Sequence, residues 1–476
     1  MVETGILSLL APAVTIVLAI TTRQVILSLV VGIISGFLVL SNFHVGNALA
    51  DSVQGLVGVF KSEWAVKILI FTMMVSGIIH LAKVTGGTQG LVALLTEKSK
   101  VVKGPVSTQL LGAAIAALIF IDSYLAMLTS GAVTNDLAKK YRVSREQLAY
   151  VSQNTGISMW SSVMINGWGA AMMGVIAGQV QLGFISGEPF AILAQSIAYN
   201  LFAWASILVV ILTLFTKFSF PEMRKANERA AQGIELREGA IPLSMEQGAE
   251  LEQPTKGSAM NLLLPLLVTV CAVPVGLYIT GNGVLADGSG STSVLWAVML
   301  GQAVGFVYYV FVTRQMKVND YFGHLLTGYQ SMVPLIVVLT LALLIGNVAG
   351  QLQIGAYLSE QIGDFVPVSL VAAFIFVCAG IISLSTGTSW GTFSIMIPIG
   401  VQLAVAAGAD PYLAIGAAIS GAIWGDTVSP ISDTGIMMST ATKNDHMDHI
   451  KTQLPYCLTA SAIALFGFVI MGAILS

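Results

Sequence analysis

The chain has 476 residues, of which 55% are hydrophobic and only 9% are charged, and its formal net charge is −3. Soluble domains carry about 25% charged residues, so this composition excludes an ordinary soluble domain, and the lack of a basic tail argues against a nucleic-acid partner. Uncharged runs such as 25–40, 262–280 and 454–476 approach or reach the roughly 20 residues that cross a bilayer as a helix. The sequence therefore predicts an all-α polytopic membrane protein, embedded in a lipid bilayer.

In the first half, polar breaks predict spans near 5–22, 24–41, 64–83, 146–180 and 188–216. The apolar stretch 104–138 has basic residues just before it and just after it. Basic residues near membrane ends mark the cytoplasmic side, so both ends of this stretch are expected to face the cytoplasm. Its length is too short for two spans of roughly 20 residues plus a turn. We therefore predict a re-entrant hairpin.

A linker over 217–258, rich in charge, Gln and Gly, is predicted to lie in the cytoplasm. The second half is predicted to span near 259–281, 293–312, 332–350, 410–442 and 453–475. The apolar stretch 366–408 has no Lys or Arg nearby and is predicted to be a second hairpin that opens on the opposite side. This threading leaves only Lys61 and Lys67 away from the cytoplasmic side and places both termini outside.

The two halves, 1–216 and 259–476, resemble each other. Leu148 and Trp160 match Leu413 and Trp424. Each half holds about five spans, one of them broken, and one hairpin. Since five is odd, the two repeats are predicted to be inverted. Inverted repeats with interrupted helices that meet near the midplane are the architecture of secondary transporters.

The second broken span, 410–442, contains two carboxylates in an apolar setting, Asp426 and Asp433, with Pro430 between them. A charge at bilayer depth costs at least about 2.5–3.5 kcal/mol, and such residues usually line a cavity or bundle interior. Carboxylates, hydroxyls and carbonyls are the oxygens that hard cations prefer. We therefore predict a Na⁺ site at the two aspartates. The predicted ion-binding residues are Asp426, Asp433, Thr427, Ser429, Ser432 and Asp122, the last being the only charge in 104–135. The alternative is that the aspartates cap the broken half-helices.

The tip of the second hairpin and the first broken span are predicted to complete the site by binding substrate. The residues are Thr386, Thr388, Ser389, Trp390, Asn154 and Asn166. Each has a structural alternative. Membrane hydroxyls often donate to preceding backbone carbonyls, amides often join helices, and a Trp at a break can simply pack.

The run Gly425–Thr434, together with Thr386–Gly391, resembles the NhaC family of sodium-coupled antiporters, and the likeness extends through Thr22–Arg23 and Asp122–Tyr124. The resemblance implies a scaffold domain, a transport domain with two opposed hairpins, and a bacterial cytoplasmic membrane. It implies Na⁺ as the coupling ion, no other cofactor, and a homodimer through the scaffold half. Family members include Na⁺/H⁺ antiporters, malate/lactate exchangers and Na⁺-linked amino-acid carriers, and the motif does not separate them.

The function predicted from the sequence is Na⁺-coupled secondary transport, with Na⁺/H⁺ exchange by alternating access as the leading form. The alternative is Na⁺-driven movement of a small amino acid or carboxylate. An intramembrane enzyme is disfavoured because no His accompanies the aspartate motif, and a channel is disfavoured because two hairpins suit a gated carrier.

Overall fold

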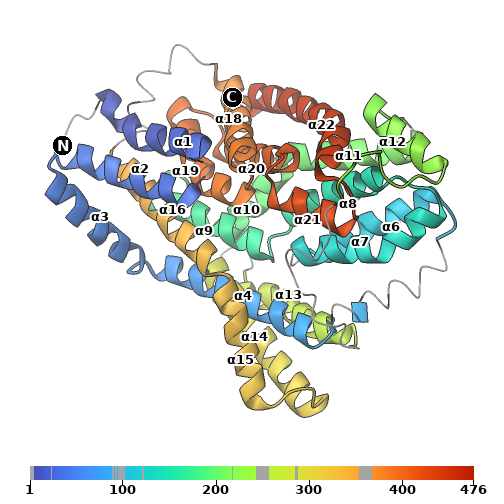
Figure 1. The fold of residues 1–476 in the computed structure, drawn as a ribbon. Helices are drawn as coiled ribbons and strands as arrows, with labels where there is room; N and C mark the ends of the chain where they lie inside the picture. The colour runs from blue at the N-terminus through green and yellow to red at the C-terminus, as the bar shows by residue number, and fades with distance from the viewer. Residues whose placement is uncertain are drawn as a thin grey trace.

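The fold is that of a computed structural model. It describes residues 5–22, 24–87, 90, 91, 94, 102–120, 123–216, 218–242, 257–284, 288–352, 357 and 367–475. Within these ranges the regular structure is helical, and the only β pairing is an isolated bridge between Pro242 and Asp445. Figure 1 shows the helices gathered into one bundle, with α14 and α15 at its lower end.

The described residues of the first half form a series of helices. They are α1 (Leu10–Thr22), α2 (Val25–Leu40), α3 (Val45–Val59), α4 (Glu63–Val84), α6 (Pro105–Leu118), α7 (Ser123–Lys140), α8 (Arg145–Trp160), α9 (Gly167–Gln181), α10 (Pro189–Ala198) and α11 (Leu201–Thr216). The linker then forms α12 (Pro221–Ala231).

The described residues of the second half are also helical. Its helices are α13 (Met260–Thr280), α14 (Gly290–Phe306), α15 (Val318–Ser331), α16 (Val333–Gln351), α18 (Val371–Thr386), α19 (Ser389–Ala407), α20 (Pro411–Val428), α21 (Asp433–Ala441) and α22 (His446–Leu475). A π-helical turn, Val307–Val312, extends α14.

Six helices in the described residues are long and apolar enough to cross a membrane, namely α4, α13, α14 with its π-turn, α18, α19 and α22. Two bent pairs, α10 with α11 and α15 with α16, raise the number to eight if each pair is one span. The predicted class, an α-helical polytopic membrane protein, is confirmed. The count of about five spans in each half stays a prediction.

Four consecutive helices of the second half begin at a constant distance from their counterparts in the first. Pro105 and Val371, Ser123 and Ser389, Arg145 and Pro411, and Gly167 and Asp433 are each 266 residues apart. This register differs by one or two residues from the pairing that the sequence suggested, so Trp160 corresponds in position to Asp426 rather than to Trp424. The opposed orientation of the two repeats stays a prediction.

The two predicted hairpin stretches each form a pair of packed helices that reaches into the other half. Within its own half, α6 packs on α8 and α18 packs on α20. Across the halves, α7 packs on α21 and α19 packs on α9. The two predicted broken spans, α8 with α9 and α20 with α21, are therefore each in contact with both helix pairs. Whether the pairs are re-entrant in a bilayer stays a prediction.

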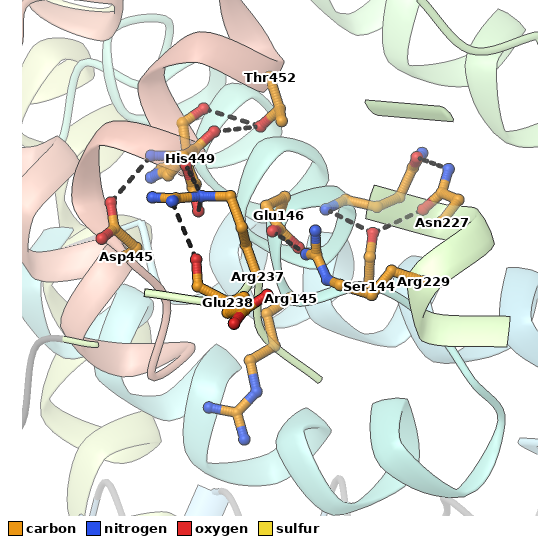
Figure 2. A network of polar contacts seen from close by, with 12 residues as sticks. Ser144, Arg145, Glu146, Asn227, Arg229, Arg237, Glu238, Asp445, His449 and Thr452 are labelled. Carbon is orange, nitrogen blue, oxygen red and sulfur yellow. Dashed lines mark hydrogen bonds and ion pairs between the residues drawn. The ribbon is translucent and has the colours of Figure 1, made fainter. Parts of the chain in front are cut away.

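The linker is held to the helix ends by ion pairs. Glu146, at the start of α8, pairs with Arg229 of α12. Glu235 pairs with Lys139, at the end of α7, at 2.7 Å, and also with Arg145. Figure 2 shows the pair of Glu146 with Arg229 at the junction of α8, α12 and the start of α22. Glu235, in the segment after α12, thus joins the end of α7 to the start of α8.

Candidate cation site

The break between α20 and α21 is encoded locally. Proline disfavours helical backbone in the residue before it, and Ser429, which precedes Pro430, has the extended values φ −75° and ψ 128°. After the four residues 429–432 the helix resumes at Asp433, and Ser432 caps it by accepting a hydrogen bond on Oγ from the backbone N–H of Gly435 at 3.1 Å. Ser is a preferred residue at such a helix start. The predicted broken helix is therefore present, interrupted at 429–432.

Asp426 lies near the end of α20 and is 1% exposed. Its carboxylate is surrounded by hydroxyl groups from three parts of the chain. Oδ2 accepts a hydrogen bond from Ser389 Oγ at 2.8 Å. Oδ1 accepts from Ser432 Oγ at 2.5 Å and from Thr434 Oγ1 at 3.3 Å. The start of α19, the break and the first turn of α21 thus meet at one carboxylate.

Among the residues that the structure describes, no Lys, Arg or His forms an ion pair with Asp426. A buried carboxylate without a cationic partner is costly, and hydroxyl donors offset only part of that cost. A proton or a bound cation is therefore needed to neutralise it. A site that can accept either is the chemical requirement for exchanging one for the other.

Asp433, half-buried, is the first residue of α21, where the helix dipole favours a negative charge. Its Oδ1 accepts from the backbone N–H of Thr434 at 2.7 Å. Its Oδ2 accepts from the hydroxyl of Tyr124, at the start of α7. The two aspartates therefore have different hydrogen-bond partners, with Asp426 in the hydroxyl cluster and Asp433 at the contact between α7 and α21.

The remaining predicted ion-binding hydroxyls are engaged with backbone. Thr427 Oγ1 donates to the carbonyl of Ile423 at 2.7 Å, and Ser429 Oγ donates to that of Leu384 at 2.8 Å. The first bond lies within α20, and the second joins the end of α20 to α18. The structure thus does not bring them onto Asp426. The predicted residue Asp122 lies outside the described residues.

Of the predicted substrate-binding residues at the tip between α18 and α19, only Ser389 makes a hydrogen bond to Asp426. Thr386 Oγ1 donates to the carbonyl of Ile382 at 2.9 Å. Thr388 is extended and precedes α19 without capping it through its side chain. Trp390 packs on Trp168 of α9, with ring centroids 5.4 Å apart.

The two asparagines have structural contacts. Asn166 starts α9, accepting from Gly169 N–H at 2.8 Å and donating to the carbonyl of Phe120 at 3.0 Å. Asn154 donates to Gln453 Oε1 at 3.1 Å, which joins α8 to α22.

Three residues of the site were not singled out from the sequence, namely Thr434, Gln153 and Tyr124. Gln153 Nε2, on α8, is 3.4 Å from Thr434 Oγ1.

The correspondence between the two halves contains a signal that could have identified Tyr124. With the 266-residue spacing, Tyr124 corresponds to Trp390 and Asp433 to Gly167, and a Cβ on Gly167 would lie 3.1 Å from the Trp390 ring. The same inter-half contact thus occurs twice, once polar and once apolar.

Comparison with known proteins agrees with this architecture. Residues 163–473 match the model of the Na⁺/H⁺ antiporter family. An uncharacterised protein of Haemophilus influenzae is 30% identical, over 99% of this chain and 91% of its own length. The malate-2H⁺/Na⁺-lactate antiporter of Bacillus subtilis is 34% identical over 23% of each chain. The solved structure of the YdaH transporter of Alcanivorax borkumensis has the same fold at 13% identity, with a TM-score of 0.60 over 89% of this chain and 88% of that one.

The family match covers the second broken span and its hydroxyl cluster, and the full-length relative covers the rest, which confirms the resemblance seen in the motif. The chain is a member of the Na⁺/H⁺ antiporter family and a secondary transporter of that type.

Proposed function

We propose that this transporter exchanges Na⁺ for H⁺ at Asp426. The observation that carries the proposal is the buried carboxylate with three hydroxyl neighbours and no basic partner in the described part of the chain. Na⁺ bound there would have the carboxylate and the oxygens of Ser389, Ser432 and Thr434 as ligands. These are the oxygen types that hard cations take.

The hydroxyl groups suit both states of an exchanger. A hydroxyl has one donor and two acceptor lone pairs, and its hydrogen rotates to suit its neighbours. With Na⁺ bound, the hydroxyls turn their lone pairs toward the ion. Without Na⁺, they donate hydrogen bonds to the carboxylate or accept one from the protonated carboxyl group. Competition between Na⁺ and H⁺ for one carboxylate then couples the two fluxes.

Alternating access is proposed to move the parts that bear the hairpins, with the helix pairs α6–α7 and α18–α19, against a scaffold built from the earlier spans of each repeat. The contacts of α7 on α21 and of α19 on α9 are where such a movement would be transmitted. We place the protein in a bacterial cytoplasmic membrane with its linker inside, following the distribution of Lys and Arg. A homodimer through the scaffold half follows from the family resemblance.

A second candidate is Na⁺-driven exchange of a small carboxylate or amino acid. Two observations favour it: the Bacillus subtilis relative is a malate and lactate antiporter, and the rings of Trp390, Trp168 and Phe393 pack together next to Ser389. Such rings can wall an organic solute.

The test is ²²Na⁺ uptake into proteoliposomes driven by an outward proton gradient. We expect uptake without added solute by the native protein and its loss in Asp426→Asn, which keeps the shape but removes the charge. Asp51→Asn, an exposed aspartate on α3, is the matched control and should transport normally. Uptake that strictly requires malate, lactate or an amino acid would replace exchange by the second candidate, and native uptake by Asp426→Asn would remove Asp426 from the site.

A further inference from the structure

A buried amide of the first half adjoins the hydroxyl cluster of the second half. Gln153 lies on α8 and is 0% exposed. Its Nε2 is 3.4 Å from Oγ1 of Thr434, which itself donates to Asp426. Its Oε1 is buried and has no hydrogen-bond partner among the described residues. One end of this amide therefore contacts the cluster, and the other has an unsatisfied acceptor.

An acceptor buried without a donor costs about 1–3 kcal/mol, so such groups call for an explanation. The oxygen and nitrogen share one carbon, and a half-turn about the terminal bond exchanges their positions. After that turn, the oxygen faces Thr434 and the carboxylate. An amide oxygen in that position is a normal ligand for a hard cation.

We propose that the side-chain oxygen of Gln153 is a ligand of the cation bound at Asp426. The inference rests on the proposed function and extends it, because it makes the cation site span both halves of the molecule. In the cation-free state the amide donates to Thr434. In the cation-loaded state it turns and coordinates the ion.

The position of Gln153 relative to Asp426 is fixed by its neighbour. Asn154 donates to Gln453 Oε1 at 3.1 Å, and Gln453 Nε2 donates to the carbonyl of Thr427 at 2.8 Å. This buried chain links α8 through α22 to the last turn of α20, next to Asp426. A rotation of α8 relative to α20 during transport would break the chain and withdraw the amide oxygen, so that cation affinity is tied to the arrangement of the two halves.

The experiment compares Gln153→Leu, which removes the oxygen, with Gln153→Glu, which keeps an oxygen and removes the amide. Gln109→Leu is the matched control, because Gln109 on α6 is also buried with an unpartnered Oε1 but makes no hydrogen bond to the cluster. The half-saturating concentrations of Na⁺ and Li⁺ are measured by proton-driven uptake in proteoliposomes and by the cation-dependent rise in melting temperature of the purified protein.

We expect Gln153→Leu to raise the half-saturating Na⁺ concentration by about tenfold or more, the scale on which supporting groups change metal affinity. The Na⁺/Li⁺ affinity ratio should change too, since ligand number and cavity size set selectivity. Gln153→Glu should restore Na⁺ affinity to within a few-fold, and Gln109→Leu should behave as native. If Gln153→Leu does not fold, Gln153→Asn, which withdraws the amide by one methylene, should show the same rise.

Native Na⁺ affinity in the Leu or Asn variant, or an equal loss for Na⁺ and Li⁺, would overturn the assignment. Asp426→Asn is run in parallel. If Asp426→Asn abolishes cation binding while Gln153→Leu binds normally, only this inference fails. If Asp426→Asn binds the cation normally, the proposed function itself fails.

Discussion

At the scale of single residues, the two halves present different chemistry at corresponding positions. Trp160 ends α8 where the repeat register places Asp426 in α20, and it donates its ring N–H to the carbonyl of Ala116 at 2.9 Å. Gly167 starts α9 where Asp433 starts α21. At the two positions where the second half has carboxylates, the first half therefore has a tryptophan and a glycine. The polar chemistry is accordingly concentrated in the second half, with Gln153 and Tyr124 contributed by the first.

Tyr124→Phe tests the contact between the tip of α7 and Asp433. The hydroxyl donates to a carboxylate, and a hydrogen bond to a charged group contributes about 1.5–3 kcal/mol. We expect Tyr124→Phe to slow transport, and a double-mutant cycle with Asp433→Asn to give a coupling energy of about 0.5–3 kcal/mol, as for residues in contact. Tyr141→Phe, in the turn just after α7, is the control, because its hydroxyl donates to the carbonyl of Val102. Additive effects of the two changes would contradict a functional contact.

Ser389→Ala tests the hydroxyl cluster around Asp426. The change removes the donor to Oδ2 and leaves a buried acceptor short of one partner, which costs about 1–3 kcal/mol. We expect the half-saturating Na⁺ concentration to rise several-fold in proteoliposome uptake. Ser394→Ala, on the same helix, removes a hydroxyl that donates to the carbonyl of Trp390 and should leave Na⁺ affinity unchanged. A native Na⁺ affinity in Ser389→Ala would exclude Ser389 as a ligand.

At the scale of elements, the end of α18 packs against the break between α20 and α21. Gly387 ends α18 in left-handed backbone, φ +68°, where residues with a side chain are strained. A Cβ there would also lie 2.7 Å from the carbonyl oxygen of Ile431. The backbone of the tip thus touches the backbone of the break, one residue from Ser432. This contact positions Ser389 beside Asp426.

Gly387→Ala is expected to lower both stability and Na⁺ affinity. The left-handed conformation alone costs about 1 kcal/mol for alanine, and the contact with Ile431 adds to it by pushing the tip from the break. Melting temperature in detergent and Na⁺ titration of that temperature would measure the two effects. Gly408→Ala, at the other end of α19, shares the positive φ of +71° but meets nothing within 4 Å. It should lower stability without altering Na⁺ affinity.

The helices and their breaks could be predicted from the sequence because their causes are local. Pro430 ends α20, and the apolar run sets the length of α13, whereas α22 begins at His446, seven residues before the predicted span 453–475. Contacts between side chains of the two halves could not be predicted in the same way. Gln153 and Thr434 are 281 residues apart, and Tyr124 and Asp433 are 309 apart. Such contacts depend on how the two halves pack, and hydropathy carries no information on that. The hydroxyls of Thr427 and Ser429 belong to the motif but donate to backbone carbonyls, Thr427 within α20 and Ser429 to Leu384 of α18.

At the scale of the whole molecule, the placement of the linker in the cytoplasm rests on the charges and can be tested by labelling. With the native cysteines replaced, Lys225→Cys on the exposed face of α12 should react with a membrane-impermeant maleimide only after cells are opened. Val284→Cys, exposed between α13 and α14, should react in intact cells. Labelling of Lys225→Cys in intact cells would invert the predicted topology.

The linker also makes the stability of the folded protein depend on pH. Hydrogen bonds from Lys139 and Arg145 hold the pKa of Glu235 below its ordinary value. A carboxyl group whose pKa is lowered by folding stabilises the folded state above its unfolded pKa, near 4.5, and loses that contribution as the pH falls through the folded pKa. The ion pairs join the end of α7 and the start of α8 to the linker, so their loss loosens the ends of the helices that carry Tyr124 and Gln153.

Glu235→Gln should therefore lower the melting temperature at pH 7, where the native carboxylate is paired, and should flatten its fall between about pH 5 and pH 3. Melting curves of the purified protein across this range measure both effects, and the difference between native and variant curves removes the contribution of other carboxyl groups. Glu228→Gln, whose carboxylate lies 3.9 Å from Arg224 on the exposed side of α12, is the control. Exposed pairs contribute about 0–1 kcal/mol, so it should follow the native curve. If the melting temperatures of native protein and Glu235→Gln fall in parallel with pH, the linker does not contribute to the stability of α7 and α8.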